Sequence, residues 1–431
     1  MMQITAPNPF FHRGPVRDPA HFFGRKRETT TVVDLLCQGQ SIAISGARRL
    51  GKTSLLFHLG HADLAATHRL GPSVARWVYL DGGMLDGLDE TWFYGAVDRG
   101  LGGDDDALPY ARFVERIRAL AAERVRLILA IDEFELVAAN PHFGRELFNR
   151  LRGLMAQYGM QCLTASKAPL VDLTFAHPET LSSPFFNMFA PLRVSLFTDD
   201  AALTLLSNLS TRGRRPFGSQ TLMSLRDLAG PHPLFLQVAG YHAFAALQEQ
   251  AGGELSSAAL AAVRSQTLAD IEPHLRYAWS GLDAEARHTL AALPVLAAER
   301  PARVMERLTT AGMLRDGQYA GGALEVFIRR QQVEGLLQGG DFVLDMRRGR
   351  VAVRGQPVHL TPTEFAALRL FLERPGLLLT PQAIEAALWP NDIAPDPERA
   401  RGVVKKLRAA LGPAGNAIHN RRGQGYLLSV D

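Results

Sequence analysis

The chain has 431 residues, of which 47% are hydrophobic and 21% charged. That length is too great for one ordinary hydrophobic core and suits two to four domains of a soluble globular protein. No apolar run approaches the roughly 18–20 residues that span a bilayer, and the N-terminus lacks the pattern of a secretory signal. Two cysteines, Cys37 and Cys162, exclude a disulfide framework and a cysteine-rich zinc site. We therefore expect a cytoplasmic protein without a membrane segment.

Positive charge is concentrated near the C-terminus. The chain carries 47 Lys or Arg residues against 43 Asp or Glu, and residues 397–431 alone hold seven basic residues against two acidic ones. A basic patch on an otherwise balanced chain indicates a polyanionic partner for that end of the protein. A solvated basic surface is the alternative, and charge alone does not separate the two.

The first strong motif lies between a predicted strand and a predicted helix. Ser41–Ser45 is a short apolar run typical of a buried strand, and an apolar helix start follows the motif. Between them the chain matches G-x-x-x-x-G-K-[ST] at every fixed position, the signature of a phosphate-binding loop. Lys52 would contact the β- and γ-phosphates of ATP, and the Thr53 hydroxyl would bind Mg²⁺. The expected nucleotide-binding residues are Gly46, Ala47, Arg48, Arg49, Leu50, Gly51, Lys52, Thr53 and Ser54.

A second predicted strand ends in two carboxylates. Arg126–Ile131 is strand-like, and Asp132 and Glu133 follow it directly, where parallel strands end at the active-site edge of a sheet. Asp132 would hold the Mg²⁺ shell, and Glu133 would orient or deprotonate the attacking water. Lys52 and Glu133 are thus expected to be catalytic, with ATP and Mg²⁺ as cofactors.

A third predicted strand, residues 160–166, ends in small hydroxyl residues. Thr164 or Ser166 would be placed to sense the γ-phosphate, and Ser166 is our candidate nucleotide-binding residue. A role in capping the following turn is the alternative.

The segment Asn8–Glu28, taken with the phosphate-binding loop and the acidic pair, resembles the STAND-type signalling ATPases of the AAA+ class. The resemblance extends over roughly residues 8–335. It implies that Phe23, Gly24 and Arg25 lie against the adenine side of the nucleotide.

The resemblance also implies that a proline in a helical lid contacts the base. The segment Leu228–Gln237 matches the family's Gly-x-Pro segment, in a register that leaves Pro233 and His232 as candidates. Pro233 also suits the first turn of a helix, and both roles are compatible.

No arginine finger is evident in the sequence. Arg145 and Arg152, in a helical stretch after the acidic pair, are candidates, and Arg152 is our choice as a third catalytic residue. An ordinary solvated helix face is the alternative, since Glu146 and Arg150 already form an i,i+4 pair. Without such a charge in place, we expect slow ATP hydrolysis.

These features predict an α/β P-loop core of AAA+ type with a parallel sheet, followed by a helical lid and winged-helix modules. We expect the core over residues 1–188 and the lid over 189–275, where apolar residues recur at helical spacing. Residues 276–335 are similar to the winged-helix module of STAND proteins, ending in a small hairpin and a helix, and 331–340 is an expected linker.

Residues 341–431 strongly resemble the OmpR/PhoB-type winged-helix output domain. The motifs are Leu360–Phe365, with a capping box from Thr361 to Glu364, Leu407–Arg408 and Arg422–Tyr426. The resemblance implies that the third helix, Pro397–Leu411, enters the major groove of double-stranded DNA and that the closing hairpin touches the adjoining minor groove or backbone. The implied DNA-binding residues are Arg401, Lys405, Lys406, Arg408 and Arg422.

The leading hypothesis is an ATP-switched transcription regulator that forms nucleotide-dependent homo-oligomers. One alternative is an AAA+ ATPase that assembles on or remodels DNA, with robust DNA-stimulated hydrolysis and little sequence preference. Another is a STAND sensor whose C-terminal domain recruits a protein.

Overall fold

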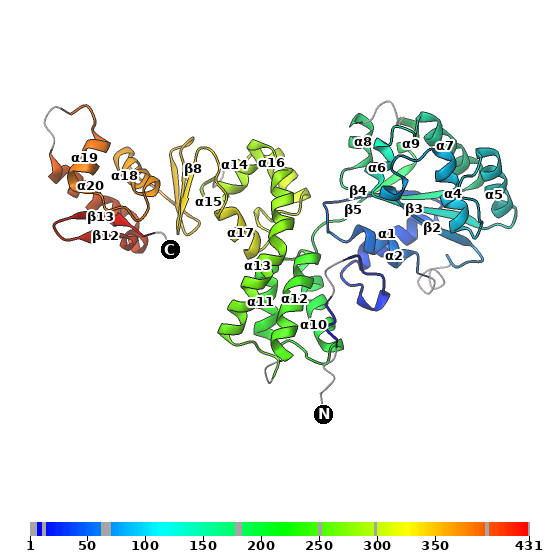
Figure 1. Ribbon diagram of the computed structural model, residues 1–431, viewed down its shortest axis with the longest axis horizontal. Coiled ribbons are helices and arrows are strands. Elements are labelled where there is room, and N and C mark those ends of the chain that lie inside the picture. The colour runs from blue at the N-terminus through cyan, green and yellow to red at the C-terminus, as the bar shows by residue number, and fades with distance from the viewer. Residues whose placement is uncertain are drawn as a thin grey trace. The chain divides into compact units, whose positions relative to one another are not determined.

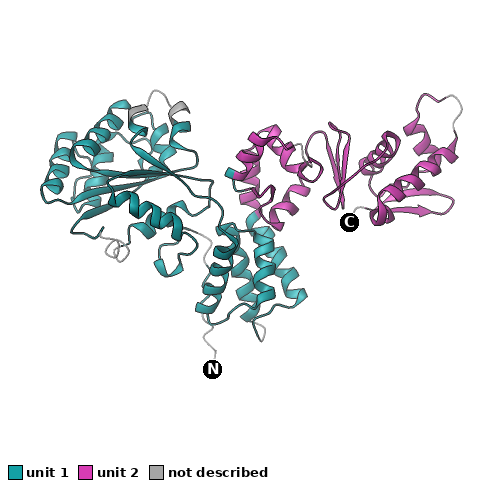
Figure 2. Cartoon of the chain, turned by 180° about the vertical axis from the view of Figure 1, so that it is seen from behind, with its two compact units in different colours: residues 1–271, 310–312 teal, residues 272–309, 313–431 magenta. Residues whose placement is uncertain are grey.

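The computed structural model describes residues 7–10, 14–61, 70–176, 183–248, 252–296, 300–392 and 396–429. The last two residues of the predicted domain 341–431 lie outside the described residues. Contacts divide the chain into two compact units (Figure 2), which we describe separately: unit 1 is 1–271 with 310–312, and unit 2 is 272–309 with 313–431. Within the described residues, no helix is long and apolar enough to cross a membrane.

A five-stranded parallel sheet forms the centre of unit 1 (Figure 1). Its order is β2-β3-β4-β1-β5, and every neighbouring pair is parallel. The inner strands are almost wholly buried, as expected for a sheet with helices on both faces. The strands are β1 (Ser41–Ser45), β2 (Ala75–Asp81), β3 (Arg126–Asp132), β4 (Gln161–Ser166) and β5 (Phe189–Arg193).

Helices cover the two faces of this sheet and build two separate apolar cores. Helices α4 to α7 pack on one face, and α1 and α2 pack on the other. The helices are α1 (Lys26–Cys37), α2 (Lys52–Leu59), α4 (Glu90–Gly100), α5 (Tyr110–Ala122), α6 (Phe134–Ala139), α7 (Arg145–Tyr158), α8 (Leu170–Ala176) and α9 (Ser183–Phe186), with 3₁₀ turns η1 (Pro19–His21) and η2 (Gly82–Leu85).

The core sheet extends beyond the predicted domain end at residue 188. Strand β5 pairs along the whole of β1, so residues 189–193 belong to the core and not to the lid. Pro191 explains the error, because proline lowers strand propensity in the sequence but is tolerated on an edge strand such as β5.

A group of helices follows β5, over the residues expected to form the lid, and we refer to it as the lid. Its helices are α10 (Asp199–Arg212), α11 (Ser219–Ala229), α12 (Pro233–Gln248) and α13 (Ser257–Ser280). Helix α13 continues through the predicted lid end at residue 275, and the two units divide inside it, between Ile271 and Glu272.

The N-terminal segment is fastened to this lid. The Asn8 amide donates to the Tyr241 carbonyl at 2.9 Å, and Phe10 is buried against α12. A β-carbon at Gly240 would lie 2.3 Å from the Phe10 ring, so only glycine leaves room for that ring. The Phe10 ring also stacks on Phe217 with centroids 5.5 Å apart.

Unit 2 begins inside α13, and the residues expected to form a winged-helix-like module follow; we refer to them as the helical module. Its elements are α14 (Ala284–Ala291), α15 (Leu293–Leu296), α16 (Ala302–Thr310), the hairpin β6 (Leu314–Arg315) and β7 (Gln318–Tyr319), and α17 (Gly322–Arg329). The expected hairpin and final helix are both present.

A four-stranded antiparallel sheet of order β11-β10-β9-β8 follows. Its strands are β8 (Leu336–Gly339), β9 (Phe342–Asp345), β10 (Arg350–Val353) and β11 (Gln356–Val358). The expected linker 331–340 is therefore wrong in part, since residues 336–339 form the first strand. The two glycines that suggested a linker instead belong to a tight hairpin turn, in which Gly340 has a φ of 53°.

Both faces of this sheet are covered. Phe342 and Leu344 on β9 enter the core of the winged helix, so the alternate residues Val343 and Asp345 point to the other face. Helix α15 packs against β9, β10 and β11 there, and all four β9 residues are buried.

The winged helix continues with the three predicted helices and the closing hairpin. The Thr361–Glu364 capping box is formed, with both reciprocal hydrogen bonds present. The elements are α18 (Pro362–Glu373), α19 (Pro381–Leu388), α20 (Pro397–Ala410), η3 (Gly412–Ala417), β12 (Ile418–Arg421) and β13 (Gly425–Leu428).

Candidate functional site

The phosphate-binding loop joins β1 to α2, as its sequence predicts. Gly51 adopts a φ of 91° immediately before the helix, a conformation that favours glycine. A β-carbon at Gly46 would lie 2.3 Å from the Val194 carbonyl oxygen, so the start of the loop also requires glycine. The loop therefore presents its amides and the N-terminus of α2 to the same space, which is the arrangement that binds phosphate.

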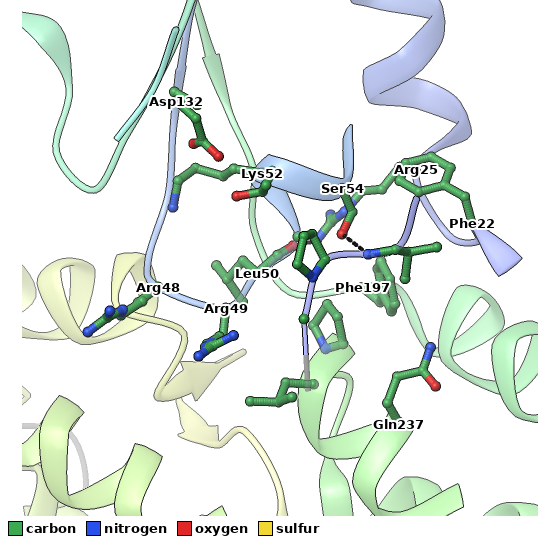
Figure 3. A pocket seen from close by; sticks show the side chains of 18 of the residues that line it. Phe22, Arg25, Arg48, Arg49, Leu50, Lys52, Ser54, Asp132, Phe197 and Gln237 are labelled. Carbon is green, nitrogen blue, oxygen red and sulfur yellow. Dashed lines mark hydrogen bonds between the residues drawn. The ribbon is translucent and has the colours of Figure 1, made fainter. Parts of the chain in front are cut away.

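Lys52 is the first residue of α2 and lines the resulting pocket. Its ammonium donates to the carbonyls of Gly46 at 2.7 Å and Ala47 at 3.0 Å. Burial lowers the pKa of Lys52, and the nearby carboxylates of Glu135 and Asp132 act in the opposite direction. Figure 3 shows this side chain beside Asp132 at the pocket wall.

The acidic pair lies at the carboxyl end of β3, and both residues line the pocket. Asp132 is 4% exposed, and one of its oxygens accepts a 3.2 Å hydrogen bond from the Tyr79 hydroxyl. The other oxygen accepts a 3.0 Å bond from the Glu133 amide. Burial, together with the charge of Asp132, raises the pKa of Tyr79, which therefore remains a hydrogen-bond donor.

Two charged residues that the sequence analysis did not select also line the pocket. Glu135 lies one residue beyond the predicted pair, and Lys167 directly follows β4. Their side chains are 3.3 Å apart, and the second Glu135 oxygen is buried without a hydrogen-bond partner among the described residues. The sequence offered one indication for each of them: Glu135 is close to the acidic pair, and Lys167 is next to Ser166.

The two hydroxyl residues of β4 occupy different positions. Ser166 lines the pocket, and its hydroxyl donates to the Ala168 carbonyl at 2.5 Å, which is the turn-capping contact considered above. Thr164 is fully buried and is not among the lining residues.

Of the residues that the resemblance assigns to the base, Phe23 lines the pocket, whereas Gly24 is not among the lining residues. Gly24 has a φ of 78°, and a β-carbon there would lie 2.8 Å from the Phe197 ring. The neighbouring Phe22 stacks on His58 with ring centroids 4.0 Å apart. Close packing therefore holds this segment against α2 and against the chain after β5.

Arg25 lines the pocket but is 3% exposed, and its guanidinium is engaged in several contacts. It donates to the carbonyls of Leu50 at 2.8 Å and Ser195 at 2.6 Å, and it pairs with Glu28 at 2.7 Å. It also lies 4.5 Å from the Phe197 ring centroid. Arg25 therefore ties the phosphate-binding loop to α1 and to the segment after β5.

The lid contributes through the start of α12. Pro233 is the first residue of that helix and lines the pocket, together with Leu234 and Gln237. His232 is not among the lining residues, and its ring stacks on Phe235 at 3.9 Å. The structure thus favours Pro233 over His232 as the lid residue facing the nucleotide.

Of the predicted loop residues, Arg48–Ser54 line the pocket, whereas Gly46 and Ala47 are not among the lining residues. Arg48 and Arg49 are exposed, whereas the Ser54 hydroxyl accepts a 2.9 Å hydrogen bond from the Val16 amide (Figure 3). The pocket-lining residues are Gly14, Pro15, Val16, His21, Phe22, Phe23, Arg25, Arg48, Arg49, Leu50, Gly51, Lys52, Thr53, Ser54, Asp132, Glu133, Glu135, Ala165, Ser166, Lys167, Phe197, Leu205, Pro233, Leu234 and Gln237.

The arginine-finger candidates lie elsewhere. Arg145 and Arg152 are exposed on α7, and neither is among the described residues that line the pocket. The expected Glu146–Arg150 pair is formed, and Arg150 also pairs with Glu90.

The pocket fits a nucleoside triphosphate with Mg²⁺. Buried amides, an ammonium group and a helix N-terminus meet where phosphates would bind, and apolar side chains meet where a base would lie. The Thr53 hydroxyl and the Asp132 carboxylate supply oxygen ligands of the kind that Mg²⁺ prefers. Among the described residues, no group of three or more His, Cys, Asp or Glu side chains is arranged to hold a metal ion, so a metal here would rely on phosphate oxygens as well.

The candidate DNA-contacting residues lie on α20 and on the closing hairpin. Arg401, Lys405 and Lys406 are exposed, and Arg422 is exposed in the turn between β12 and β13. Arg408 is half-buried and donates to the Gly415 carbonyl at 3.3 Å, which also ties α20 to the turn that follows it. Val404 and Leu407 anchor the opposite side of α20 in the core.

The fold and the pocket define this chain as a P-loop NTPase of the AAA+ type joined to a winged-helix DNA-binding domain. Comparison with protein families agrees. Residues 106–294 match the family "Novel STAND NTPase 2", and residues 355–428 match the family "Transcriptional regulatory protein, C terminal". The chain therefore contains a STAND NTPase domain and an OmpR/PhoB-type DNA-binding domain.

Curated relatives share only part of the chain. It is 32% identical to the transcriptional activator protein IrlR of Burkholderia pseudomallei over 97 residues, which are 22% of this chain and 42% of that protein. It is 30% identical to the transcriptional regulatory protein PcoR of Escherichia coli over 103 residues, or 23% of this chain and 46% of that protein. The chain thus spans less than half the length of these relatives.

Solved structures support the fold of the larger part. The ORC2 protein of Aeropyrum pernix is similar over 75% of this chain and 88% of that chain, with a TM-score of 0.51 and 13% identity. A Walker-type ATPase of Pyrococcus abyssi is similar over 74% of this chain and 99% of that chain, with a TM-score of 0.50 and 13% identity. At such identity the likeness concerns the fold alone.

Proposed function

We propose that this protein is a transcription regulator in which ATP binding controls sequence-specific binding to double-stranded DNA. The observation that carries the proposal is the union, in one chain, of a complete P-loop pocket and a winged helix with an exposed basic recognition helix. The NTPase would act as a switch, and its slow turnover would reset it.

Contacts within unit 2 support control of the DNA-binding domain. Asp345 of β9 is fully buried and lies 3.1 Å from the Arg348 guanidinium and 3.5 Å from the His288 ring of α14. The Arg350 guanidinium donates to the Leu296 carbonyl of α15 at 3.4 Å. Because α15 also packs on the sheet, a change in the helical module would be passed to the DNA-binding domain.

A contact within unit 1 indicates where such a change would begin. Residues 310–312, which are the last residue of α16 and the two that follow it, group with the NTPase core by their contacts. A β-carbon at Gly312 would lie 3.7 Å from the Leu50 side chain and 3.6 Å from Leu196. The phosphate-binding loop therefore has a neighbour on the stretch of chain that leads into the hairpin β6–β7.

The pocket residues have distinct roles in this proposal. Lys52 and the amides of the loop hold the phosphates, and Thr53 and Asp132 hold Mg²⁺, which would neutralise charge developing on the phosphates. Glu133, half-exposed at the end of β3, orients the attacking water.

Arg152 would complete the site from a second copy of the chain. It is exposed on α7 and is not among the described residues that line the pocket of its own chain, so it would act in a nucleotide-dependent homo-oligomer. Light scattering with and without ATP would test this assembly.

Binding of a selected DNA site with ATP and with ADP tests the switch. We expect affinity to differ between the two nucleotides by about 5- to 150-fold, the usual range of allosteric coupling. Lys52→Ala should remove the difference by preventing nucleotide binding. Glu133→Gln should slow ATP hydrolysis, because activation of the water contributes about 10²–10⁴-fold to the rate of such reactions. The variant should therefore stay in the ATP-bound state for longer and keep the DNA affinity of that state.

Identical DNA affinity in all six combinations of protein and nucleotide would refute the switch. Robust DNA-stimulated hydrolysis without a preferred site would instead favour a DNA-remodelling ATPase.

A further inference from the structure

Tyr79 lies outside the pocket but contacts its metal-binding carboxylate. It sits on β2 directly opposite Ala130 of β3, and Asp132 is two residues further along β3 on the same face. The small side chain of Ala130 leaves room for the tyrosine ring to reach along the sheet. The hydroxyl then donates to Asp132 Oδ2 at 3.2 Å.

The Tyr79 ring is itself held by the helix that follows the phosphate-binding loop. Phe57 of α2 packs on it with ring centroids 4.7 Å apart, and the Arg17 guanidinium lies 4.4 Å from the centroid of the Phe57 ring. Thr53, the other expected Mg²⁺ ligand, is one helical turn before Phe57. Tyr79 thus connects the helix bearing one ligand to the strand bearing the other.

Loss of the hydroxyl would leave the carboxylate poorly oriented. Asp132 is buried, and its other oxygen already accepts the Glu133 amide at 3.0 Å. Lys52 is within electrostatic reach of Asp132 but donates to loop carbonyls instead. Without the Tyr79 donor, Asp132 could turn toward the ammonium that is needed for phosphate.

We infer that Tyr79 is a positioning residue, which orients Asp132 for Mg²⁺ and keeps it apart from Lys52. This inference rests on the proposed nucleotide site and adds a residue to it. It concerns metal affinity, so it is measurable without hydrolysis.

The test uses calorimetry to measure how the binding of a non-hydrolysable ATP analogue to full-length Tyr79→Phe depends on the Mg²⁺ concentration. The substitution keeps the ring and its packing on Phe57. We expect the Mg²⁺ concentration for half-maximal tight binding to rise about tenfold, as for other residues that orient metal ligands. ADP affinity in EDTA should stay at the wild-type value.

Tyr94→Phe is the matched control, because the Tyr94 hydroxyl likewise donates to a carboxylate, that of Glu90, at 3.1 Å in a partly buried hydrogen bond. It should leave the Mg²⁺ requirement unchanged. An unchanged or lower requirement in Tyr79→Phe, or an equal rise in the control, would overturn the inference. A loss of ADP affinity in EDTA would do the same, by showing general damage. If the wild type shows no Mg²⁺-dependent nucleotide binding, the proposed function fails instead.

Discussion

Arg25 connects three parts of the NTPase core through one side chain. The resemblance places it beside the base, yet its guanidinium contacts the Leu50 and Ser195 carbonyls and the Glu28 carboxylate. A planar group with five donors suits such divergent acceptors, which a lysine could not satisfy together. The position of the phosphate-binding loop therefore depends on Arg25 whether or not the side chain also touches a base.

Arg25→Ala should lower the free energy of unfolding by about 3–5 kcal/mol, because it removes a buried guanidinium and leaves the Glu28 carboxylate and the Leu50 and Ser195 carbonyls without their partner. ATP and ADP affinity should fall by similar factors, since both nucleotides use the loop. Urea denaturation and nucleotide titration measure the two effects. Arg27→Ala, an exposed change on the same helix, should alter stability by no more than about 0.5 kcal/mol. Equal stability of the two variants would contradict this role.

At the scale of elements, local patterns predicted the parts with short-range causes. The strand, loop and helix around Gly46–Thr53 and the capping box at Thr361 lie where the sequence indicates, because each depends on neighbours within a few residues. Strand β5 and strand β8 were not predicted. In the local sequence, Pro191 and the glycine pair 339–340 indicate the end of a strand. These segments are strands because β5 pairs with β1 and β8 pairs with β9.

The site follows the same division. The loop residues Arg48–Ser54 and the acidic pair were predicted, and the structure brings them to one pocket. Tyr79 and Phe197 were not, because they meet the site through sheet register and through packing between distant segments. A single sequence carries no sign of such contacts.

The recognition helix α20 gives a prediction at this scale. If Lys405 contacts a phosphate, Lys405→Ala should weaken binding to specific and unrelated DNA alike and reduce the slope of log affinity against log salt by about 0.9. Fluorescence anisotropy at several salt concentrations measures that slope. Arg369→Ala on α18, where the arginine pairs with Glu373 at 2.7 Å, serves as the control and should leave the slope unchanged. An unchanged slope in Lys405→Ala would indicate that α20 does not face the duplex.

At the scale of the whole molecule, the sheet β8–β11 joins the winged helix to the helical module within unit 2. One of its faces completes the winged helix and the other is packed on α15. A DNA-binding domain whose sheet packs on the helical module in this way is not tethered by a loose linker. Its position should therefore follow the helical module, which makes the buried charge cluster around Asp345 a test of the coupling.

Arg348→Ala should abolish the effect of the bound nucleotide on DNA affinity, while the protein still binds both nucleotide and DNA. Asp345 is fully buried, and loss of its 3.1 Å partner should destabilise the contact between β9 and α14 by about 1–3 kcal/mol. The ratio of DNA affinities with ATP and ADP should then approach one, while nucleotide affinity and the better of the two DNA affinities are retained. The adjacent Arg347→Ala is the control, since Arg347 is 53% exposed and lies 3.9 Å from Glu334 at the surface. Retention of the full wild-type ratio in Arg348→Ala, with the destabilisation confirmed by thermal unfolding, would show that the signal does not pass through this contact.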